Sequence, residues 1–183
     1  MKKTCFWLAL IGFGALIIGA CSSSDETPTS TSSTSLPDYA ATTLSGKIGT
    51  DWTFQTGRMV VPSSSSGSYW YSMTNDNLSN ACSSSYTGTS SNPKVTYSRA
   101  DAPTAGETEL SFTSGNVKTV TFYDGTTNYI VAKGKITIDT VTTTAVTGKM
   151  YAISGTDTDH EINGTFTLSR CCTSGSSYAL CSE

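Results

Sequence analysis

The residues whose types and spacing could support catalysis lie in one short segment that contains Asp157, Asp159, His160 and Glu161. His160 is the only histidine of the chain, so a Ser-His-Asp triad would have to use it. The sequence contains no G-x-S-x-G motif of the kind that positions a nucleophilic serine. We therefore expect His160 to be an exposed residue of a hairpin loop. An enzyme that uses His160 is the third candidate function, and the protein is predicted not to be an enzyme.

The same segment offers three carboxylates at alternate positions, Asp157, Asp159 and Glu161. Carboxylate oxygens are the ligands that a hard cation such as Ca²⁺ prefers, so these residues form a candidate metal site. The segment lacks the glycine and the distant bidentate glutamate of an EF-hand loop. A solvated polar turn is the alternative interpretation, and no cofactor is predicted.

Aromatic residues form the other candidate binding site, and these are Trp52, Tyr69, Trp70 and Tyr71. If residues 69–71 belong to a strand, Trp70 faces one side of the sheet and both tyrosines face the other. Such a cluster could stack on a sugar or on an apolar ligand. Aromatic residues are also favoured in strands and must fill some of the core, so sheet packing is the alternative.

The N-terminal residues have the order of features found in an export signal. Lys2 and Lys3 precede an uncharged, mostly apolar run over residues 5–20, which is short for a membrane span but suits a signal peptide. The run ends in Ile18-Gly19-Ala20-Cys21, which resembles the lipobox of bacterial lipoproteins. This resemblance implies that residues 1–20 are a signal peptide, that cleavage precedes Cys21, and that Cys21 is lipidated and anchors the chain to a membrane.

The residue after the lipobox cysteine bears on the location. In lipoproteins of Gram-negative bacteria, Asp at this position usually signals retention at the inner membrane, and here the position is Ser22. The resemblance therefore implies a lipid-anchored protein of the outer membrane in the cell envelope. In a Gram-positive source the same anchor would place the domain on the cell surface.

Composition divides the rest of the chain into a tether and one domain. Among the 16 residues 22–37, 11 are Ser or Thr, so residues 21–37 are predicted to be the lipidated cysteine and a disordered tether. Residues 38–183 have the size of one domain with its own core. The whole chain has 11 basic and 14 acidic residues and a net charge of −3, which argues against a nucleic acid as partner. An unknown ligand or protein remains the expected partner.

Period-two alternation of apolar and polar residues predicts an all-β domain. The pattern is clearest in four successive segments, which we expect to form an antiparallel C-terminal meander: 117–123, 130–138, 146–153 and 161–170. Within 130–138 only Val131 breaks the alternation. Further strands are expected at 44–48, 52–54, 58–61, 68–73 and 94–99. The fold is therefore predicted to be an antiparallel sandwich or a closed barrel of roughly eight to ten strands.

Four cysteines remain if residues 1–20 are removed and Cys21 is lipidated: Cys82, Cys171, Cys172 and Cys181. An even number of cysteines in an exported domain predicts two disulfides. A bond between the adjacent Cys171 and Cys172 would be strained, which excludes one connectivity. Two connectivities stay open, in which Cys82 pairs with either Cys171 or Cys172 and the other one pairs with Cys181.

Gly49-Thr50-Asp51-Trp52 is similar to the G-x-W motif at the start of lipocalin barrels, with one additional residue. That similarity implies a lipocalin-like carrier that encloses a small apolar ligand, and this is the second candidate function. The leading candidate is a non-catalytic envelope lipoprotein, in which a disulfide-linked β-domain on a tether has a binding or structural role. A carrier needs a lined internal cavity, whereas a packed domain does not.

Overall fold

The computed structural model describes residues 35–83, 86, 92–113, 116–155, 159–175 and 177–182. The proposed signal peptide, Cys21 and most of the proposed tether lie outside these residues. Residues 35–183 form one compact unit. In the part of the chain that is described, no helix is long and apolar enough to span a membrane.

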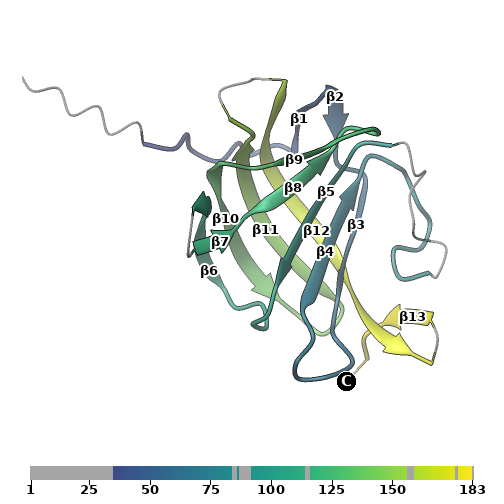
Figure 1. Cartoon of the computed structure of the whole chain (residues 1–183). Helices are drawn as coiled ribbons and strands as arrows, with labels where there is room; N and C mark the ends of the chain where they lie inside the picture. The colour runs from purple at the N-terminus through teal and green to yellow at the C-terminus, as the bar shows by residue number, and fades with distance from the viewer. Residues whose placement is uncertain are drawn as a thin grey trace, which may run out of the picture. The chain divides into compact units, whose positions relative to one another are not determined.

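The described chain is all-β, as the alternation predicts (Figure 1). Its strands are β1 (Ser45–Ile48), β2 (Thr50–Thr53), β3 (Thr56–Val60), β4 (Tyr69–Thr74), β5 (Lys94–Arg99), β6 (Gly106–Thr113), β7 (Asn116–Lys118), β8 (Val120–Tyr123), β9 (Asn128–Ile130), β10 (Lys133–Val141), β11 (Ala145–Ile153), β12 (His160–Ser174) and β13 (Ser177–Leu180).

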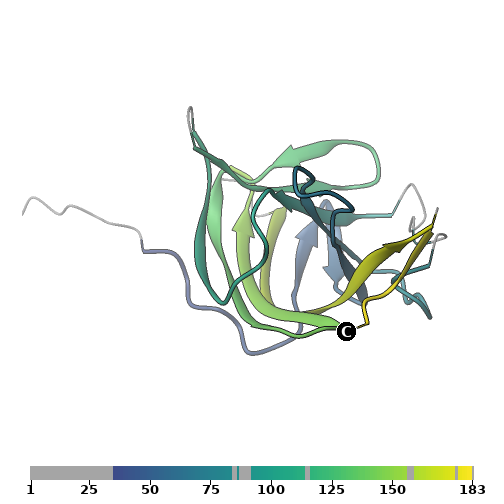
Figure 2. The ribbon, with the colours of Figure 1, turned by 90° about the horizontal axis from the view of Figure 1, so that it is seen from below.

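The strands form one nearly closed, barrel-like sheet (Figure 2). The order around the sheet is β7-β6-β10-β11-β12-β3-β4-β5-β8-β9, while β1 and β13 pair with β12 and β2 pairs with β1. Neighbouring strands are antiparallel except β12 and β3, which run parallel with Arg170 opposite Met59. The barrel alternative is therefore confirmed. The described strands number more than the predicted eight to ten because several are only three or four residues long.

The meander prediction is correct for β10, β11 and β12 and wrong for the segment before them. β8 pairs with β5 and β9 rather than with β10. The predicted strand 130–138 is interrupted at Val131, whose side chain is fully buried while Ile130 is exposed. Val131 N–H donates to the Val120 carbonyl, and the next residue, Ala132, donates to Ile153. The single break in the alternation marks the residue at which the backbone stops pairing with β8 and begins to pair with β11.

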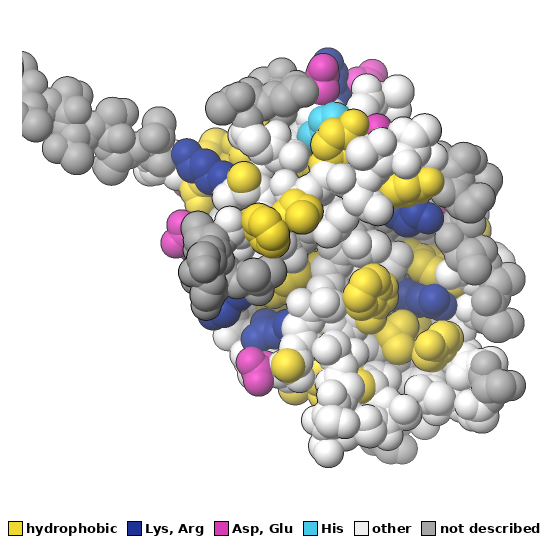
Figure 3. All heavy atoms as spheres, in the orientation of Figure 1, with side chains coloured by type: hydrophobic (Ala, Val, Ile, Leu, Met, Phe, Trp, Pro, Cys, Tyr) yellow, Lys and Arg dark blue, Asp and Glu magenta, His cyan; other side chains and the backbone are white. Residues whose placement is uncertain are grey.

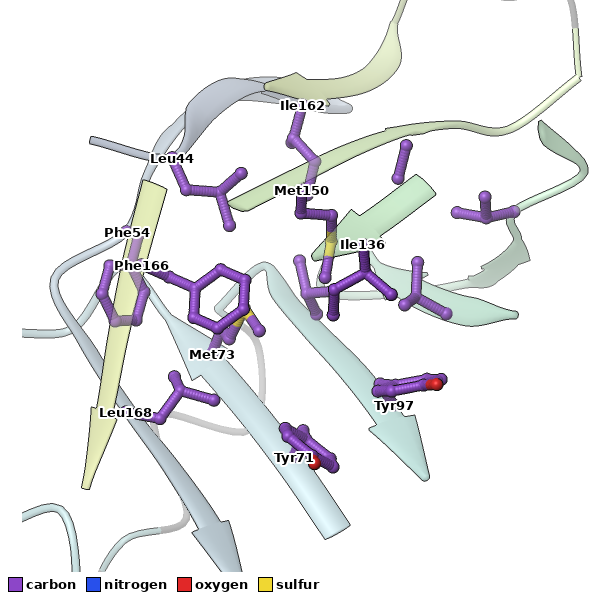
Figure 4. Close-up of a cluster of buried hydrophobic side chains, with 14 of the residues drawn as sticks. Leu44, Phe54, Tyr71, Met73, Tyr97, Ile136, Met150, Ile162, Phe166 and Leu168 are labelled. Carbon is purple, nitrogen blue, oxygen red and sulfur yellow. The ribbon is translucent and has the colours of Figure 1, made fainter. Parts of the chain in front are cut away.

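The interior of the barrel is filled with side chains. Twenty-one buried hydrophobic residues from around the sheet form one cluster. Figure 4 shows Phe54, Met73, Phe166 and Leu168 pointing toward one another in this cluster. The Phe166 ring packs directly on Gly148, where a Cβ atom would lie 2.7 Å from its Cζ. The buried side chains in the described part of the barrel thus form one continuous packed core.

The chain enters the barrel along its outer face. Leu44 N–H donates to the Thr165 carbonyl on β12, and Thr165 N–H donates to the Thr42 carbonyl. This close approach requires Gly164, whose φ is +144° and where a Cβ atom would lie 2.6 Å from the Thr42 carbonyl oxygen. The Tyr39 hydroxyl donates to Glu107 on β6 at 3.1 Å. The position from which the N-terminal segment leaves the barrel is thus fixed on the outside of its wall.

Two disulfides join the four cysteines, and they select one of the two predicted connectivities. Cys82 bonds to Cys171 with a Cα–Cα distance of 5.4 Å, and Cys172 bonds to Cys181 with a distance of 5.0 Å. Cys171 and Cys172 are consecutive in β12, so their side chains leave opposite faces of the strand and reach different partners. The bonds attach the segment around Cys82 and the chain after β13 to β12.

Candidate functional site

His160 lies in a different environment from the one predicted. It is the first residue of β12, only 7% exposed, and its imidazole stacks on the Tyr129 ring with centroids 3.8 Å apart. Its Nε2 atom has no hydrogen-bond partner among the described residues. The expectation of an exposed loop residue is wrong because β12 begins at His160 and Tyr129 of β9 covers the ring. A buried imidazole against an aromatic ring contributes to packing at this end of the barrel.

The three candidate metal ligands are only partly described. Asp157 lies outside the described residues, Asp159 forms an ion pair with Lys47 at 3.6 Å, and Glu161 lies opposite Lys47 between β12 and β1. Within the described residues no three His, Cys, Asp or Glu side chains are grouped to hold a metal ion. A cation at Asp159 and Glu161 would have to compete with the Lys47 ammonium. The metal site stays a prediction.

The four aromatic candidates separate between the two faces of the sheet. Trp52 is buried, and its indole N–H donates to the Pro93 carbonyl at 3.1 Å. Tyr71 is fully buried, and Tyr69 is half-buried and packs against the core. Trp70 points outward and is 47% exposed. The alternation predicted for residues 69–71 is present, and Trp70 alone of the four presents a largely accessible ring.

Trp70 lines a shallow groove on the outer face of the barrel. The groove has a volume of about 390 Å³ and is formed with Lys94, Thr96, Tyr123 and Asn128. These residues come from β4, β5, β8 and β9, in which Lys94 lies opposite Tyr123 and Tyr123 lies opposite Asn128. Figure 3 shows hydrophobic side chains beside Lys and Arg side chains on this face. The groove therefore combines aromatic rings, one ammonium group and neutral hydrogen-bonding groups.

One side of the groove is held in place by the turn between β8 and β9. The Asp124 carboxylate accepts hydrogen bonds from the N–H groups of Thr126 and Thr127, both at 2.8 Å. These bonds lower the pKa of Asp124 to about 2. The Tyr123 hydroxyl donates to the Gly125 carbonyl at 2.7 Å, and the Lys94 ammonium lies 5.1 Å from the centre of the Tyr123 ring. Tyr123 and Lys94 are thus oriented before any ligand arrives.

A half-buried arginine on the neighbouring part of the wall, Arg58, has a structural role. The Arg58 guanidinium lies 4.3 Å from the centre of the Tyr86 ring and 5.0 Å from that of Tyr178, and donates to the carbonyls of Ala81 and Ser83. Burial lowers the pKa of Arg58, and the neighbouring tyrosines oppose this effect. The cation attaches the segment that carries Cys82 to β3.

Comparison with protein-family models, with curated proteins and with solved structures found no match. The groove residues other than Trp70 were not predicted from the sequence, because Lys94, Tyr123 and Asn128 become neighbours only through the pairing of β5 with β8 and of β8 with β9. The Asp124-Gly125 pair, a favoured turn sequence, was the one local signal near this site.

Proposed function

We propose that this chain is a lipid-anchored envelope protein that binds a carbohydrate, without catalysis, in the outer groove beside Trp70. The single observation that carries this proposal is the placement of an exposed tryptophan in a groove on the outer wall of the barrel. Trp70 lies with Tyr123 in one groove rather than singly on the surface, and contiguous exposed aromatic surface rimmed by polar groups often marks a binding site.

The chemistry of the groove favours a sugar ring over a purely apolar ligand. A sugar has an apolar face that packs on an aromatic ring and a periphery of hydroxyl groups that need hydrogen bonds. Trp70 and Tyr123 supply aromatic surface, while Thr96, Asn128 and Lys94 supply donors and acceptors. The groove is open and shallow, so it suits a segment of an extended glycan.

The anchor part of the proposal rests on the residues of the lipobox, Ile18-Gly19-Ala20-Cys21. A lipid on Cys21 would keep the barrel close to an envelope that is rich in glycans, and residues 22–34 would supply the reach. Mass spectrometry of the mature N-terminus, after expression of the full chain in a Gram-negative host, tests this part. We expect a diacylglyceryl and acyl modification on Cys21 that the Cys21→Ala variant lacks. An unmodified Cys21 would contradict the lipoprotein assignment.

Binding is tested by titrating the full chain in detergent with a panel of hexose and N-acetylhexosamine oligosaccharides. Trp70 is exposed and Trp52 is buried, so a ligand in the groove should change the fluorescence of Trp70 in the wild type, and calorimetry gives the affinities of all variants. We expect Trp70→Ala to weaken binding by roughly thirtyfold, the loss caused by truncating an aromatic hot spot of about 2 kcal/mol. Phe112→Ala is the matched control, because Phe112 is an exposed ring on β6 outside the groove. Equal losses in both variants, or no binding to any oligosaccharide, would contradict the proposal.

The nearly closed barrel favours a second candidate, the lipocalin-like carrier. A carrier would have to open the core cluster around Phe166 to admit an apolar ligand. Binding of a fluorescent fatty acid that is unaffected by Trp70→Ala would favour the carrier over the outer groove.

A further inference from the structure

A second pocket opens at the end of the barrel where β4 begins and β5 ends, the end from which Figure 2 is viewed. Its volume is about 220 Å³, and its wall includes Tyr97, Arg99 and Asp101 from β5 and the following loop, Thr108 from β6 and Lys118 from β7. The pocket therefore lies between β5 and β6, which are not hydrogen-bonded to each other, at the place where the sheet does not close. It shares no residue with the outer groove.

The register of β5 directs Arg99 toward the mouth of the barrel. Val95, Tyr97 and Arg99 are alternate residues of β5 and leave the same face, and both Val95 and Tyr97 are buried in the core. Thr108 lies opposite the core residue Ile136, so it faces the interior as well. Arg99 forms no ion pair with any described residue. Arg99 thus follows an apolar column of side chains on this face of β5 and adds a positive charge to the pocket wall.

A residue that packs against the pocket wall, Tyr71, carries a buried hydroxyl without a partner among the described residues. Tyr71 is fully buried and lies opposite Tyr97, with ring centres 5.2 Å apart (Figure 4). Its hydroxyl has no hydrogen-bond partner among the described residues. Burial raises the pKa of Tyr71, and the nearby charge of Arg99 opposes this increase. A buried polar group without a partner destabilises a fold, so such a group in a native protein requires an explanation.

We propose that this pocket binds a small carboxylate, held by Arg99 and Lys118 and completed by the Tyr71 hydroxyl as an additional donor. The planar guanidinium of arginine matches the two oxygens of a carboxylate. The two cations and Asp101 leave a net charge of +1 around the pocket, which matches a monoanion better than a dianion such as phosphate. The volume lies below the range of about 300 to 1,000 Å³ for drug-sized ligands, so the ligand is a short aliphatic acid or the acidic end of a larger molecule.

The arginine side chains themselves supply the measurement. The chain contains three arginines, Arg58, Arg99 and Arg170. Their Nε–H groups give separate signals in a ¹⁵N correlation spectrum, and the Nε atoms of Arg58 and Arg170 are buried, so these two serve as internal controls. Propionate is the probe, and propionamide is its uncharged isostere.

We expect propionate to shift the Arg99 Nε–H signal in a saturable way, propionamide to leave it unchanged, and the signals of Arg58 and Arg170 to stay in place. Inorganic phosphate should bind at least tenfold more weakly than propionate. Equal shifts of all three signals, equal effects of propionate and propionamide, or tighter binding of phosphate would each overturn the proposal.

Three variants test the assignment of roles. Arg99→Gln should weaken propionate binding at least tenfold. Arg99→Lys should weaken it severalfold, because the positive charge stays while the bidentate hydrogen bonding of the guanidinium is lost. Tyr71→Phe should weaken binding severalfold without lowering the melting temperature, since it removes only a hydroxyl that lacks a protein partner. Lys133→Gln is the matched control, because Lys133 is an exposed lysine of β10 that lines neither the pocket nor the outer groove. Unchanged affinity in both Arg99 variants, with melting temperatures that show intact folding, would refute the site.

Discussion

The two disulfides close loops of very different length, and this difference predicts how much each one stabilises the protein. Cys82 and Cys171 are separated by 89 residues, whereas Cys172 and Cys181 are separated by 9. A cross-link restricts the unfolded chain, and the restriction grows with the logarithm of the loop length. The chain-entropy relation gives a contribution of about 4.6 kcal/mol for the long loop and about 2.7 kcal/mol for the short one at 25 °C. The long-range bond should therefore contribute about 2 kcal/mol more.

The perturbation is a pair of double variants, one with Cys82→Ala and Cys171→Ala and one with Cys172→Ala and Cys181→Ala. Alanine is chosen because Cys82, Cys171 and Cys181 are buried. The free energy of unfolding is measured by urea titration of the oxidised proteins. Each variant and the wild type are then measured again under reducing conditions, where no chain is cross-linked. Differences that remain in the reduced state report lost packing, and subtracting them leaves the contribution of each cross-link.

The expected order is the wild type, then the variant without the Cys172–Cys181 bond, then the variant without the Cys82–Cys171 bond. If the two bonds contribute equally after the packing correction, or if the short loop contributes more, the unfolded-chain reasoning is wrong for this protein. Alkylation gives an independent check of the pairing. The four cysteines of the denatured, non-reduced domain should take no label, and labelling of two or more would contradict the assignment.

Two further predictions concern the backbone and the turn beside the groove. Gly164→Ala should lower the free energy of unfolding by roughly 2 to 4 kcal/mol, because φ is positive and the Cβ atom would meet the Thr42 carbonyl. Gly106→Ala is the control, since its φ is similar but the space around it is open, and it should cost only about 1 to 2 kcal/mol. Similar losses of melting temperature in the two variants would show that the contact with the N-terminal segment is unimportant. Asp124 has a pKa of about 2 in the folded state against 3.8 in the reference state, so its stabilisation is present above about pH 4 and is lost as the pH falls toward 2. The melting temperatures of the wild type and Asp124→Asn should therefore differ at pH 5 and converge near pH 2, and a constant difference would argue against this role of the carboxylate.

Local sequence pattern predicts much of this fold. The alternation in 146–153 and 161–170 gives β11 and β12, and the short connections between neighbouring segments give their antiparallel pairing. The side chains of residues 69–71 alternate between the faces as the pattern requires. These predictions are correct because a strand's two faces and a hairpin's pairing depend on residues that are close together in the sequence.

The predictions that failed or stayed open depend on distant segments. His160 is buried because Tyr129 packs on it, and no pattern around residue 160 contains that information. The two disulfide alternatives could not be separated, since choosing between them requires the direction in which Cys171 and Cys172 leave β12 relative to Cys82. The alternation marks Val131 as an irregularity, and only the hydrogen bond of its backbone with Val120 explains it.

The sequence alone therefore determined the strand class, the faces of the clearest strands and the even set of cysteines available for pairing. Only the tertiary structure decided that the sheet curls into a nearly closed barrel, that β3 pairs in parallel with β12, and that Trp70 meets Lys94 and Tyr123 in one groove. The physical reason is that every strand carries hydrogen-bonding groups along both edges. Alternation specifies which side chains point inward, but the partner at each edge is selected by the packing of the whole core, in which residues far apart in the chain must fit together.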